Sequence, residues 1–431
     1  MKRFRAISSV GWSRVLPVLS IFLILGQLTG CLFGNKDKEQ GGGTSTSPTG
    51  PKKAVLTSFD VDPHARFIRP FGDSICWVAS SSPDTYLARL KGDRFVALDN
   101  GKVIRKFDPT NTSSPPYGLA IKDVMVDGHG NTYVVPDIKS AAPISFQGQE
   151  VMGMIKAEDV ADPENASWLL VQTGGTADDR LVGGSWVDSI ARGFGEDIIV
   201  GVVKGGINLG KTQANGAPTF VSGGTRRTAG IEYPEKIVVT TFGQGNDYVV
   251  FSKTPGSGST SAIYTFSKDI SGTNQSASKT KNLTAADNFA PSTMAPTNNG
   301  KAVWLSSTHA NKLGRIVADG SDIAISTDDL THSSTGLDAA SNVAGFAAIG
   351  NITYVLLDNG KLYHLDESKL VQDTSGIKNP ATVKFIATKF KGLSIGEGWD
   401  LAAAGNTLWI LDRSKAYRIE NADVALDTLK E

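Results

Sequence analysis

The sequence predicts an all-β protein, a seven-bladed β-propeller, and two observations carry this prediction. The first is a short phrase that recurs along the chain, spelled GNTYVVPD at 130–137 and GNTLWILD at 405–412. The second is the composition, because 47 glycines and 18 prolines in 431 residues indicate frequent turns rather than long helices. Repetition at a nearly constant interval indicates a protein built from repeated structural units.

Each copy of the phrase consists of a small-residue turn and a β-rich run that contains one large apolar residue. We refer to these seven residues as the marker residues: Trp77, Tyr133, Ile199, Tyr248, Trp304, Tyr354 and Trp409. Successive marker residues are 49 to 66 residues apart, which suits the three or four short strands of a propeller blade. Seven blades are therefore predicted, with six or eight as alternatives.

Further short strands are expected on both sides of each phrase. Those before the turn include 120–126 (AIKDVMV) and 400–404 (DLAAA), and those after it include 86–90 (YLARL) and 415–419 (KAYRI). LDNGK at 98–102 and 357–361 indicates a hairpin, since Asn-Gly favours a two-residue turn. We expect the strand before each turn to be the innermost of its blade.

Packing of the blades against one another explains the repetition. A small isolated sheet is only marginally stable, so each blade is expected to bury the marker residue of its neighbour. Residues 54–61 are expected to close the ring beside 424–429, which makes 54–431 the propeller domain. A pair of packed sandwiches is the alternative architecture.

The first 31 residues resemble the lipoprotein signal peptides of bacteria. Residues 1–14 carry four basic side chains, and 15–25 form an apolar run of 11 residues, too short to span a bilayer. LTGC at 28–31 resembles a lipobox, which implies removal of residues 1–30 and diacylation, with palmitate or a similar chain, of Cys31. The alternatives are an ordinary secretory signal and an uncleaved anchor.

Residues 31–53 are predicted to be a flexible linker behind the lipidated cysteine, because they are rich in Gly, Ser, Thr and Lys. Leu32, which follows the cysteine, favours an outer membrane or the cell surface by resemblance to enterobacterial sorting. The predicted location is therefore the cell envelope, with the lipid as the membrane partner.

Charge and cysteine content exclude several classes of protein. Without residues 1–30 the chain has 39 basic and 43 acidic side chains, which argues against nucleic-acid binding through phosphate contacts. Two cysteines cannot form a disulfide framework, and Cys76 in SICWV is expected to be a buried, inert thiol. The five histidines lack zinc-ligand spacing, and no metal or cofactor is indicated.

Two segments carry a resemblance to propeller families. Residues 115–137 resemble an NHL-type repeat, and 304–320 resemble a blade of the virginiamycin B lyase-like propellers. The lyase resemblance implies a Glu-x-His element for acid–base catalysis, which this chain lacks. The aspartates of DGHGN at 127–131 and of ADGSD at 318–322 are interpreted as turn residues rather than calcium ligands.

The loops that lead into the innermost strands are expected to converge around the central opening. Aromatic and arginine side chains favour partner binding there, so a binding face is expected at Tyr117, Arg180, Arg226, Arg227, His309 and Trp399. No catalytic residue is assigned. The predicted function is a monomeric binding or scaffolding module for protein or envelope polymer, and the alternatives are a lyase-like or hydrolytic enzyme and an adhesion or structural protein.

Overall fold

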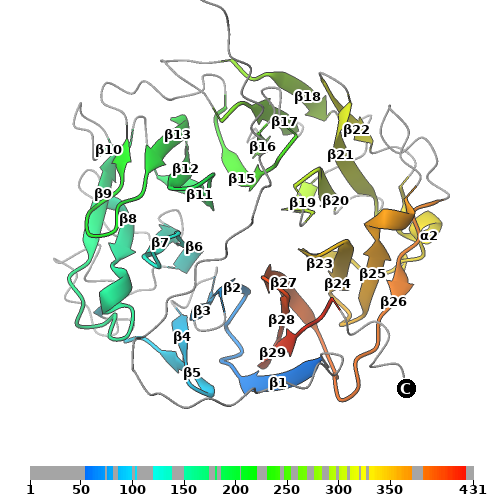
Figure 1. The fold of residues 1–431 in the computed structure, drawn as a ribbon, viewed down its shortest axis with the longest axis horizontal. Helices are drawn as coiled ribbons and strands as arrows, with labels where there is room; N and C mark the ends of the chain where they lie inside the picture. Colours follow the sequence, from blue (N-terminus) through cyan, green and yellow to red (C-terminus); the bar gives the residue numbers. More distant parts are fainter. Residues whose placement is uncertain are drawn as a thin grey trace, which may run out of the picture. The chain divides into compact units, whose positions relative to one another are not determined.

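A computed structural model gives the fold of the chain. It describes residues 54–72, 75–80, 86–99, 102–103, 120–137, 150–173, 180–181, 186–203, 205–220, 231–242, 247–253, 261–268, 276–283, 291–297, 300–307, 311–319, 322–326, 330–370 and 382–423. Seven separate sheets arranged around a central axis account for nearly all the regular structure in these residues (Figure 1). The prediction of a seven-bladed β-propeller is confirmed.

The first three blades follow one another along the chain. Blade 1 consists of β2 (Phe67–Phe71), β3 (Ile75–Ala79), β4 (Leu87–Lys91) and β5 (Arg94–Ala97). Blade 2 has five strands, β6 (Ala120–Val126), β7 (Thr132–Asp137), β8 (Glu150–Ile155), β9 (Leu169–Thr173) and β10 (Arg180–Leu181), with a short 3-10 helix η2 (Ala157–Asp159). Blade 3 consists of β11 (Val187–Arg192), β12 (Asp197–Val202), β13 (Gly206–Lys211) and β14 (Thr219–Phe220).

The next three blades repeat this meander. Blade 4 consists of β15 (Pro234–Val239), β16 (Tyr248–Lys253), β17 (Ser261–Phe266) and β18 (Lys279–Leu283). Blade 5 consists of β19 (Pro291–Pro296), β20 (Ala302–Ser307), β21 (Leu313–Asp319) and β22 (Asp322–Ser326), followed by the one-turn helix α2 (His332–Thr335). Blade 6 consists of β23 (Val343–Ile349), β24 (Ile352–Leu357), β25 (Leu362–Asp366) and β26 (Ile386–Ala387), with the 3-10 helix η5 (Glu367–Lys369).

Blade 7 joins the two ends of the propeller. Its order is β27 (Gly398–Ala404), β28 (Thr407–Asp412), β29 (Lys415–Glu420) and then β1 (Val55–Asp60), which pairs antiparallel with β29 from Val55 opposite Glu420 to Asp60 opposite Lys415. Residues 54–61 therefore close the ring, as predicted. The predicted position beside 424–429 was wrong, because β1 pairs with β29 at 415–420. Residues 424–431 lie outside the described residues.

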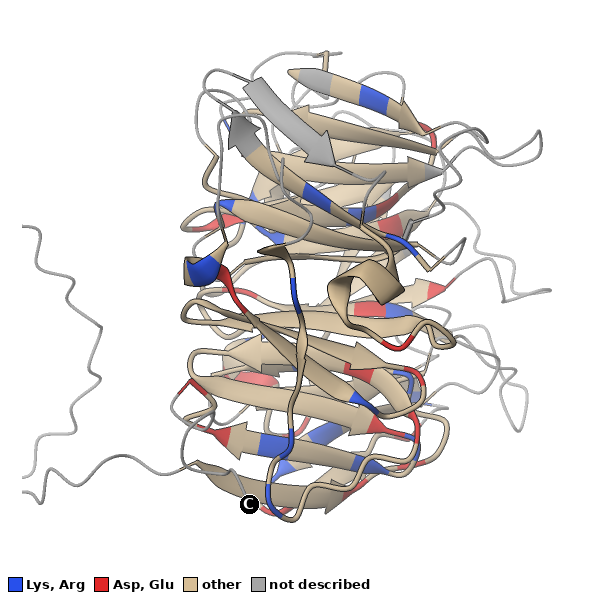
Figure 2. Ribbon diagram, turned by 90° about the vertical axis from the view of Figure 1, so that its right-hand side faces the viewer, with Lys and Arg blue, Asp and Glu red and all other residues tan. Residues whose placement is uncertain are grey.

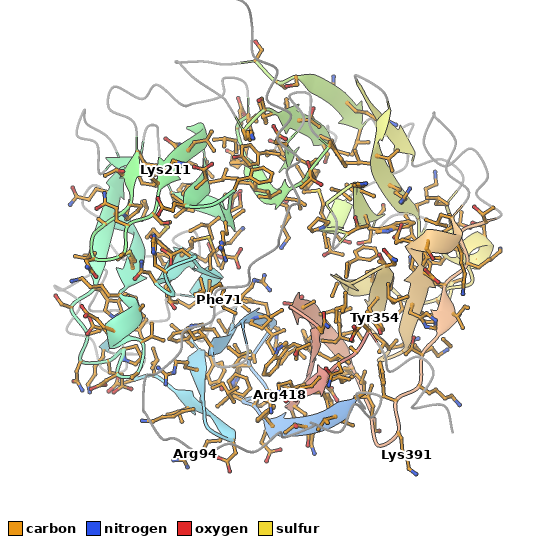
Figure 3. The ribbon with its side chains drawn as sticks, in the orientation of Figure 1. Phe71, Arg94, Lys211, Tyr354, Lys391 and Arg418 are labelled. Carbon is orange, nitrogen blue, oxygen red and sulfur yellow. The ribbon has the colours of Figure 1, made fainter. Side chains whose placement is uncertain are left out.

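The marker residues lie on the second strand of every blade and are all buried. Tyr354 in Figure 3, for example, lies between blades 6 and 7, where it packs with residues of both. Trp77, Tyr133, Ile199, Trp304, Tyr354 and Trp409 belong to clusters shared with the following blade. Burial of one blade's large side chain by the next is confirmed for these six residues.

Tyr248 is the exception among the marker residues. In the strand pairing, Val249 of β16 corresponds to Trp304 of β20. Val249 lies opposite Val238 and Trp304 lies opposite Ala295, and these two residues hold equivalent positions in their inner strands. Successive strand residues face opposite sides of a sheet, so a shift of one position turns Tyr248 back toward blade 3. It packs there beside Phe194, with ring centroids 6.0 Å apart. The prediction that Tyr248 is equivalent to the other markers was wrong.

Of the two LDNGK segments, the one at 357–361 joins a hairpin, whereas Asn100 and Gly101 of the other lie outside the described residues. Asn359 and Gly360 connect β24 to β25, and Gly360 adopts the left-handed conformation with φ of 79°. Asn359 does not have a positive φ, so the turn differs from the two-residue type expected for Asn-Gly. The segment at 98–102 follows β5, the outermost strand of blade 1, and the hairpin prediction there was wrong.

The turn of blade 2 confirms the interpretation of DGHGN. Asp127 is fully buried, and its Oδ1 accepts hydrogen bonds from the backbone N–H groups of His129 and Asn131, both at 2.9 Å. Its Oδ2 accepts hydrogen bonds from the Asn131 amide and the Tyr133 hydroxyl. This carboxylate therefore shapes an Asx-type turn. None of the described helices is long and apolar enough to cross a bilayer.

Candidate functional site in the central channel

Most of the residues expected on the binding face lie outside the described residues: Tyr117, Arg226, Arg227 and His309, together with Cys31. Arg180 is in β10, which pairs with β9 and is the outermost strand of blade 2. Figure 1 shows β10 at the outer rim of the ring, so its position does not fit the predicted loop at the central opening. Trp399 lies at the start of β27, an innermost strand, as expected.

Trp399 is half-buried and stacks against an arginine of the neighbouring blade. The guanidinium carbon of Arg66, which precedes β2, lies 4.0 Å from the centroid of the indole ring. The Arg66 guanidinium also donates hydrogen bonds to the carbonyls of Pro63 and Ala65, which hold it over the ring. A guanidinium over an indole face is a favourable cation–π arrangement. The pair therefore joins blades 7 and 1 where their inner strands begin.

A β-bulge recurs at the start of six of the seven inner strands. In each, the pairing with the second strand skips one residue, and the skipped residues are Lys122, Asp188, Glu235, Ser292, Ala344 and Trp399. A bulge bends its strand and redirects the side chains beside it. The next residue of each strand, which we call the post-bulge residue, is Asp123, Ser189, Lys236, Thr293, Gly345 or Asp400.

Five of the six post-bulge residues line a cavity of about 330 Å³ that occupies the central channel. All seven inner strands contribute to its wall, which identifies the cavity with the axis of the ring. The charged residues of the wall are Arg69, Asp123, Arg192, Lys236 and Asp400. Such a volume is at the lower end of the range for sites that hold small molecules.

Arg69 binds two carboxylates from the blades on either side of it. Its Nε donates to Asp123 Oδ1 at 2.9 Å, and its Nη1 donates to Asp400 Oδ2 at 2.7 Å. We refer to Arg69, Asp123 and Asp400 as the arginine clamp. Burial lowers the pKa of the Arg69 guanidinium, but the two carboxylates more than offset this effect and raise it above its ordinary value.

Backbone groups complete the clamp. Asp400 Oδ2 also accepts a hydrogen bond from the Ile68 N–H at 3.0 Å, and its Oδ1 accepts one from the Leu401 N–H at 2.9 Å. Asp123 Oδ1 accepts a further bond from the Val124 N–H. Hydrogen bonds from several donors fix the orientation of a carboxylate. The clamp therefore joins the inner strands of blades 7, 1 and 2.

Blades 2 and 3 are joined in a similar way by the residues that are skipped at their bulges, Lys122 and Asp188. Lys122 Nζ lies 3.0 Å from Oδ1 of Asp188, whose side chain is 1% exposed. Burial lowers the pKa of the Lys122 ammonium, but Asp188 offsets this effect and the pKa is raised overall. The positive charge of Lys122 and the negative charge of Asp188 therefore compensate each other.

Lys236 lies on the inner strand of blade 4 and has no ion-pair or hydrogen-bond partner for its side chain among the described residues. Burial in the channel lowers the pKa of its ammonium, and the positive charge of Arg69 lowers it further. Asp123 and Asp400 act in the opposite direction without cancelling these effects. The channel therefore contains a cation that is partly removed from water and unmatched by a neighbouring anion.

Arg192, at the end of β11, is an exposed member of the channel wall. Its guanidinium carbon lies 5.6 Å from the centroid of the Phe71 ring. Figure 3 shows Phe71 beside the central opening, whereas Arg94 and Lys391 lie at the outer rim. Figure 2 shows acidic and basic residues interspersed along the described strands on the side that it presents.

Cys76 is buried in β3, and burial raises the pKa of its thiol well above the ordinary value. The prediction of a buried core thiol is confirmed, and a raised pKa disfavours the thiolate, which is the reactive form. Within the described ranges no three His, Cys, Asp or Glu side chains are grouped so that they could hold a metal ion.

Sequence reasoning missed Arg69, Asp123, Lys236 and Asp400. The available signal was a charged residue inside an otherwise apolar inner strand, as in FIRPF, AIKDVMV and PEKIVV. Their convergence was hidden because Asp123 lies seven residues before the turn glycine Gly130, whereas Asp400 lies five before Gly405.

Comparison with known proteins gives similarity in fold alone. No protein-family profile matches the sequence, and no curated protein matches it. Similar solved structures include YCF48 bound to D1 peptide, with 12% identity over 86% of this chain and 96% of that chain and a TM-score of 0.48. YCF48 from Cyanidioschyzon merolae has 10% identity over 86% and 97% of the two chains and a TM-score of 0.47. The extracellular domain of the hybrid two-component system BT3049 from B. thetaiotaomicron has 13% identity over 84% and 40%, with a TM-score of 0.47.

Proposed function

We propose that this protein is a lipid-anchored lipoprotein of the bacterial cell envelope, in the outer membrane or at the cell surface. Its propeller is a binding or scaffolding module for a protein or an envelope polymer. The order of basic segment, apolar run, lipobox-like LTGC and polar linker supports the anchor. The resemblance of 115–137 to NHL-type repeats and of 304–320 to lyase-like blades belongs to the same proposal.

The arginine clamp is the observation that carries the proposal of binding rather than catalysis. General acid–base catalysis needs a carboxylate or imidazole that can exchange a proton with a substrate. Asp123 and Asp400 instead accept hydrogen bonds from Arg69 and from backbone N–H groups. Their role in this arrangement is to hold three blades together, so the channel wall is suited to present a fixed surface.

The start of the inner strands is the face that we assign to the partner. Trp399 and Arg66 form an aromatic–arginine pair there, and these residue types dominate the energetics of binding interfaces. Tyr117, Arg226, Arg227 and His309 belong to the same proposed face through the loops in which they lie.

The anchor is tested by substitution of Cys31 with a matched control in the same chain. Cys31→Ala is expected to release the protein from the membrane fraction, because the thiol that carries the lipid is removed. Cys76→Ala changes a buried cysteine in β3 and is expected to leave the membrane fraction unchanged. Retention of Cys31→Ala in washed membranes would contradict lipidation.

The partner face is tested by pull-down from intact envelopes. Partners captured by the wild type are expected to be lost with Trp399→Ala and with Arg226→Ala/Arg227→Ala, while Lys391→Ala at the outer rim retains them (Figure 3). Circular dichroism of each variant establishes that the propeller is folded. An unchanged set of partners in the folded variants would remove the assignment of this face.

A further inference from the structure

Besides the exposed Arg192, the channel wall contains the charges of the arginine clamp, which compensate one another, and the charge of Lys236, which has no such partner among the described residues. The arginine clamp contains one cation and two anions, which are bonded to one another and to backbone donors. Lys236 comes from blade 4, and its side chain has no such partner in the described part of the chain. An ammonium that is partly removed from water and unpaired favours the approach of a mobile anion.

Hydroxyl-bearing residues lie on both sides of Lys236 in the ring of post-bulge positions. Ser189 holds this position in blade 3 and Thr293 holds it in blade 5, and both line the cavity. The Ser189 hydroxyl donates to the carbonyl of Pro234, two residues before Lys236, which joins β11 to the strand that carries the lysine. The surroundings of the ammonium are therefore polar and held by the neighbouring blades.

The nearby carboxylates do not serve as the missing partner. Asp123 and Asp400 are near enough to Lys236 to raise the pKa of its ammonium, but Arg69 and Lys122 oppose them. Asp123 Oδ1 and both oxygens of Asp400 accept hydrogen bonds from Arg69 or from backbone N–H groups, so these carboxylates are already engaged in the clamp. A metal cation or an amine would have to displace Arg69, whereas an anion would displace only water from Lys236.

We propose that the central channel binds a small oxyanion, a carboxylate or a phosphate, at the Nζ of Lys236 beside Thr293. A cavity of about 330 Å³ accommodates an anion of this size with some of its water. The proposed site lies inside the ring, so it requires neither the membrane anchor nor a partner bound at the start of the inner strands. It therefore stands or falls independently of the proposed function.

Calorimetric titration of the full-length protein in detergent tests the proposal. The probes are acetate, succinate and inorganic phosphate, each titrated at constant ionic strength with chloride as the balancing anion. Binding of acetate or succinate identifies a carboxylate site, and binding of phosphate alone identifies a phosphate site. Failure of all three probes to bind at tens of millimolar would overturn the proposal.

Variants at Lys236 connect binding to this residue. Lys236→Gln is expected to weaken binding by about tenfold or more, because a charged hydrogen bond is lost, whereas Lys236→Arg retains a cation and measurable binding. Lys91→Gln changes an exposed lysine at the end of β4 and serves as the control, with affinity unchanged. Equal affinity of the wild type and Lys236→Gln would overturn the assignment, even if both bind.

The dependence of anion affinity on pH distinguishes a lysine that binds the anion directly from one that only stabilises the fold. The charged groups that act on Lys236 are Arg69, Asp123, Asp400 and Lys122. Because the pKa of Lys236 is lowered, its ammonium is neutralised at a lower pH than an ordinary lysine. Affinity is expected to fall as the pH rises through that lowered pKa, and an affinity that is independent of pH up to 10 would contradict the proposal.

Discussion

Arg69 occupies a position at which the other inner strands carry small or apolar residues. It lies opposite Trp77, and the residues opposite the corresponding second-strand positions are Met125, Ala191, Val238, Ala295, Ala347 and Ala402. Its side chain crosses to the post-bulge carboxylates of both neighbouring blades, which lie 54 and 331 residues away in the sequence. At this position of blade 1, ion pairs made by Arg69 therefore take the place that small or apolar side chains occupy in the other blades.

Removal of Arg69 leaves two partly buried carboxylates close to each other without a cation. Arg69→Met is therefore expected to lower the free energy of unfolding by about 3 kcal/mol. The measurement is thermal and urea unfolding followed by circular dichroism, with Arg94→Met at the exposed outer strand β5 as the control.

The triple variant Arg69→Met/Asp123→Asn/Asp400→Asn separates the loss of the ion pairs from the cost of unpaired charge. It is expected to recover part of the lost stability, because neutral amides tolerate the partly buried position better than carboxylates. If Arg69→Met were no less stable than Arg94→Met, the clamp would not hold the blades together.

The inner strands show which features of an element can be predicted from sequence. Short strands and their buried marker residues were predictable, because turn glycines and large apolar residues recur at regular intervals. The bulges were not predictable, since an extra residue changes pairing without changing composition. Tyr248 illustrates the result: its spacing from Gly245 matches that of Tyr133 from Gly130, yet the register places it on the opposite face of its strand.

The candidate site was harder to predict than the fold, because it depends on strand pairing and ring closure rather than on composition. Trp399 was placed correctly at the start of an inner strand, but Lys236 and Arg69 become channel residues only when seven strands share one axis. A contact such as that between Arg69 and Asp400 depends on ring closure, and no local pattern encodes it.

The close approach of β23 and β27 gives a prediction at the scale of elements. A Cβ on Gly345, the post-bulge residue of blade 6, would lie 2.7 Å from the backbone nitrogen of Leu401. Gly345→Ala is expected to destabilise the protein by about 2 kcal/mol, because two inner strands would have to separate. Thermal unfolding measures the effect.

Gly396→Ala is the matched control for Gly345→Ala. An added Cβ there would have no atom nearer than 3.9 Å, so its stability is expected to stay within about 0.5 kcal/mol of the wild type. Equal melting temperatures for the two variants would show that the strands can move apart without cost.

Closure of the ring depends on β1, the strand that blade 7 takes from the beginning of the propeller. Phe59 of β1 is buried and stacks on the marker residue Trp409, with ring centroids 5.9 Å apart. It also meets Phe95 of blade 1 edge to face, so the same side chain contacts both blades at the junction. The stability of the junction is therefore concentrated in one short strand.

Truncation of Phe59 is expected to loosen the whole ring. Phe59→Ala should lower the free energy of unfolding by about 3 kcal/mol, through lost burial and an empty space beside Trp409. Hydrogen exchange is expected to speed up in both β1 and β29, which separate together.

Val55→Ala, in the same strand but 49% exposed, is the control for Phe59→Ala. It should leave exchange in β29 unchanged. If Phe59→Ala accelerated exchange in β1 alone, blade 7 would be stable without its fourth strand.

The pairing of residues 55–60 with 415–420 also sets the order of events during synthesis of the chain. Blades 1 to 6 can form while translation proceeds, but the first-made strand has to wait until the ribosome has added more than 350 further residues. During that interval the strand has an unpaired edge, which is prone to join a neighbouring copy. Newly made protein is thus vulnerable to aggregation until β29 has been made and has paired with β1.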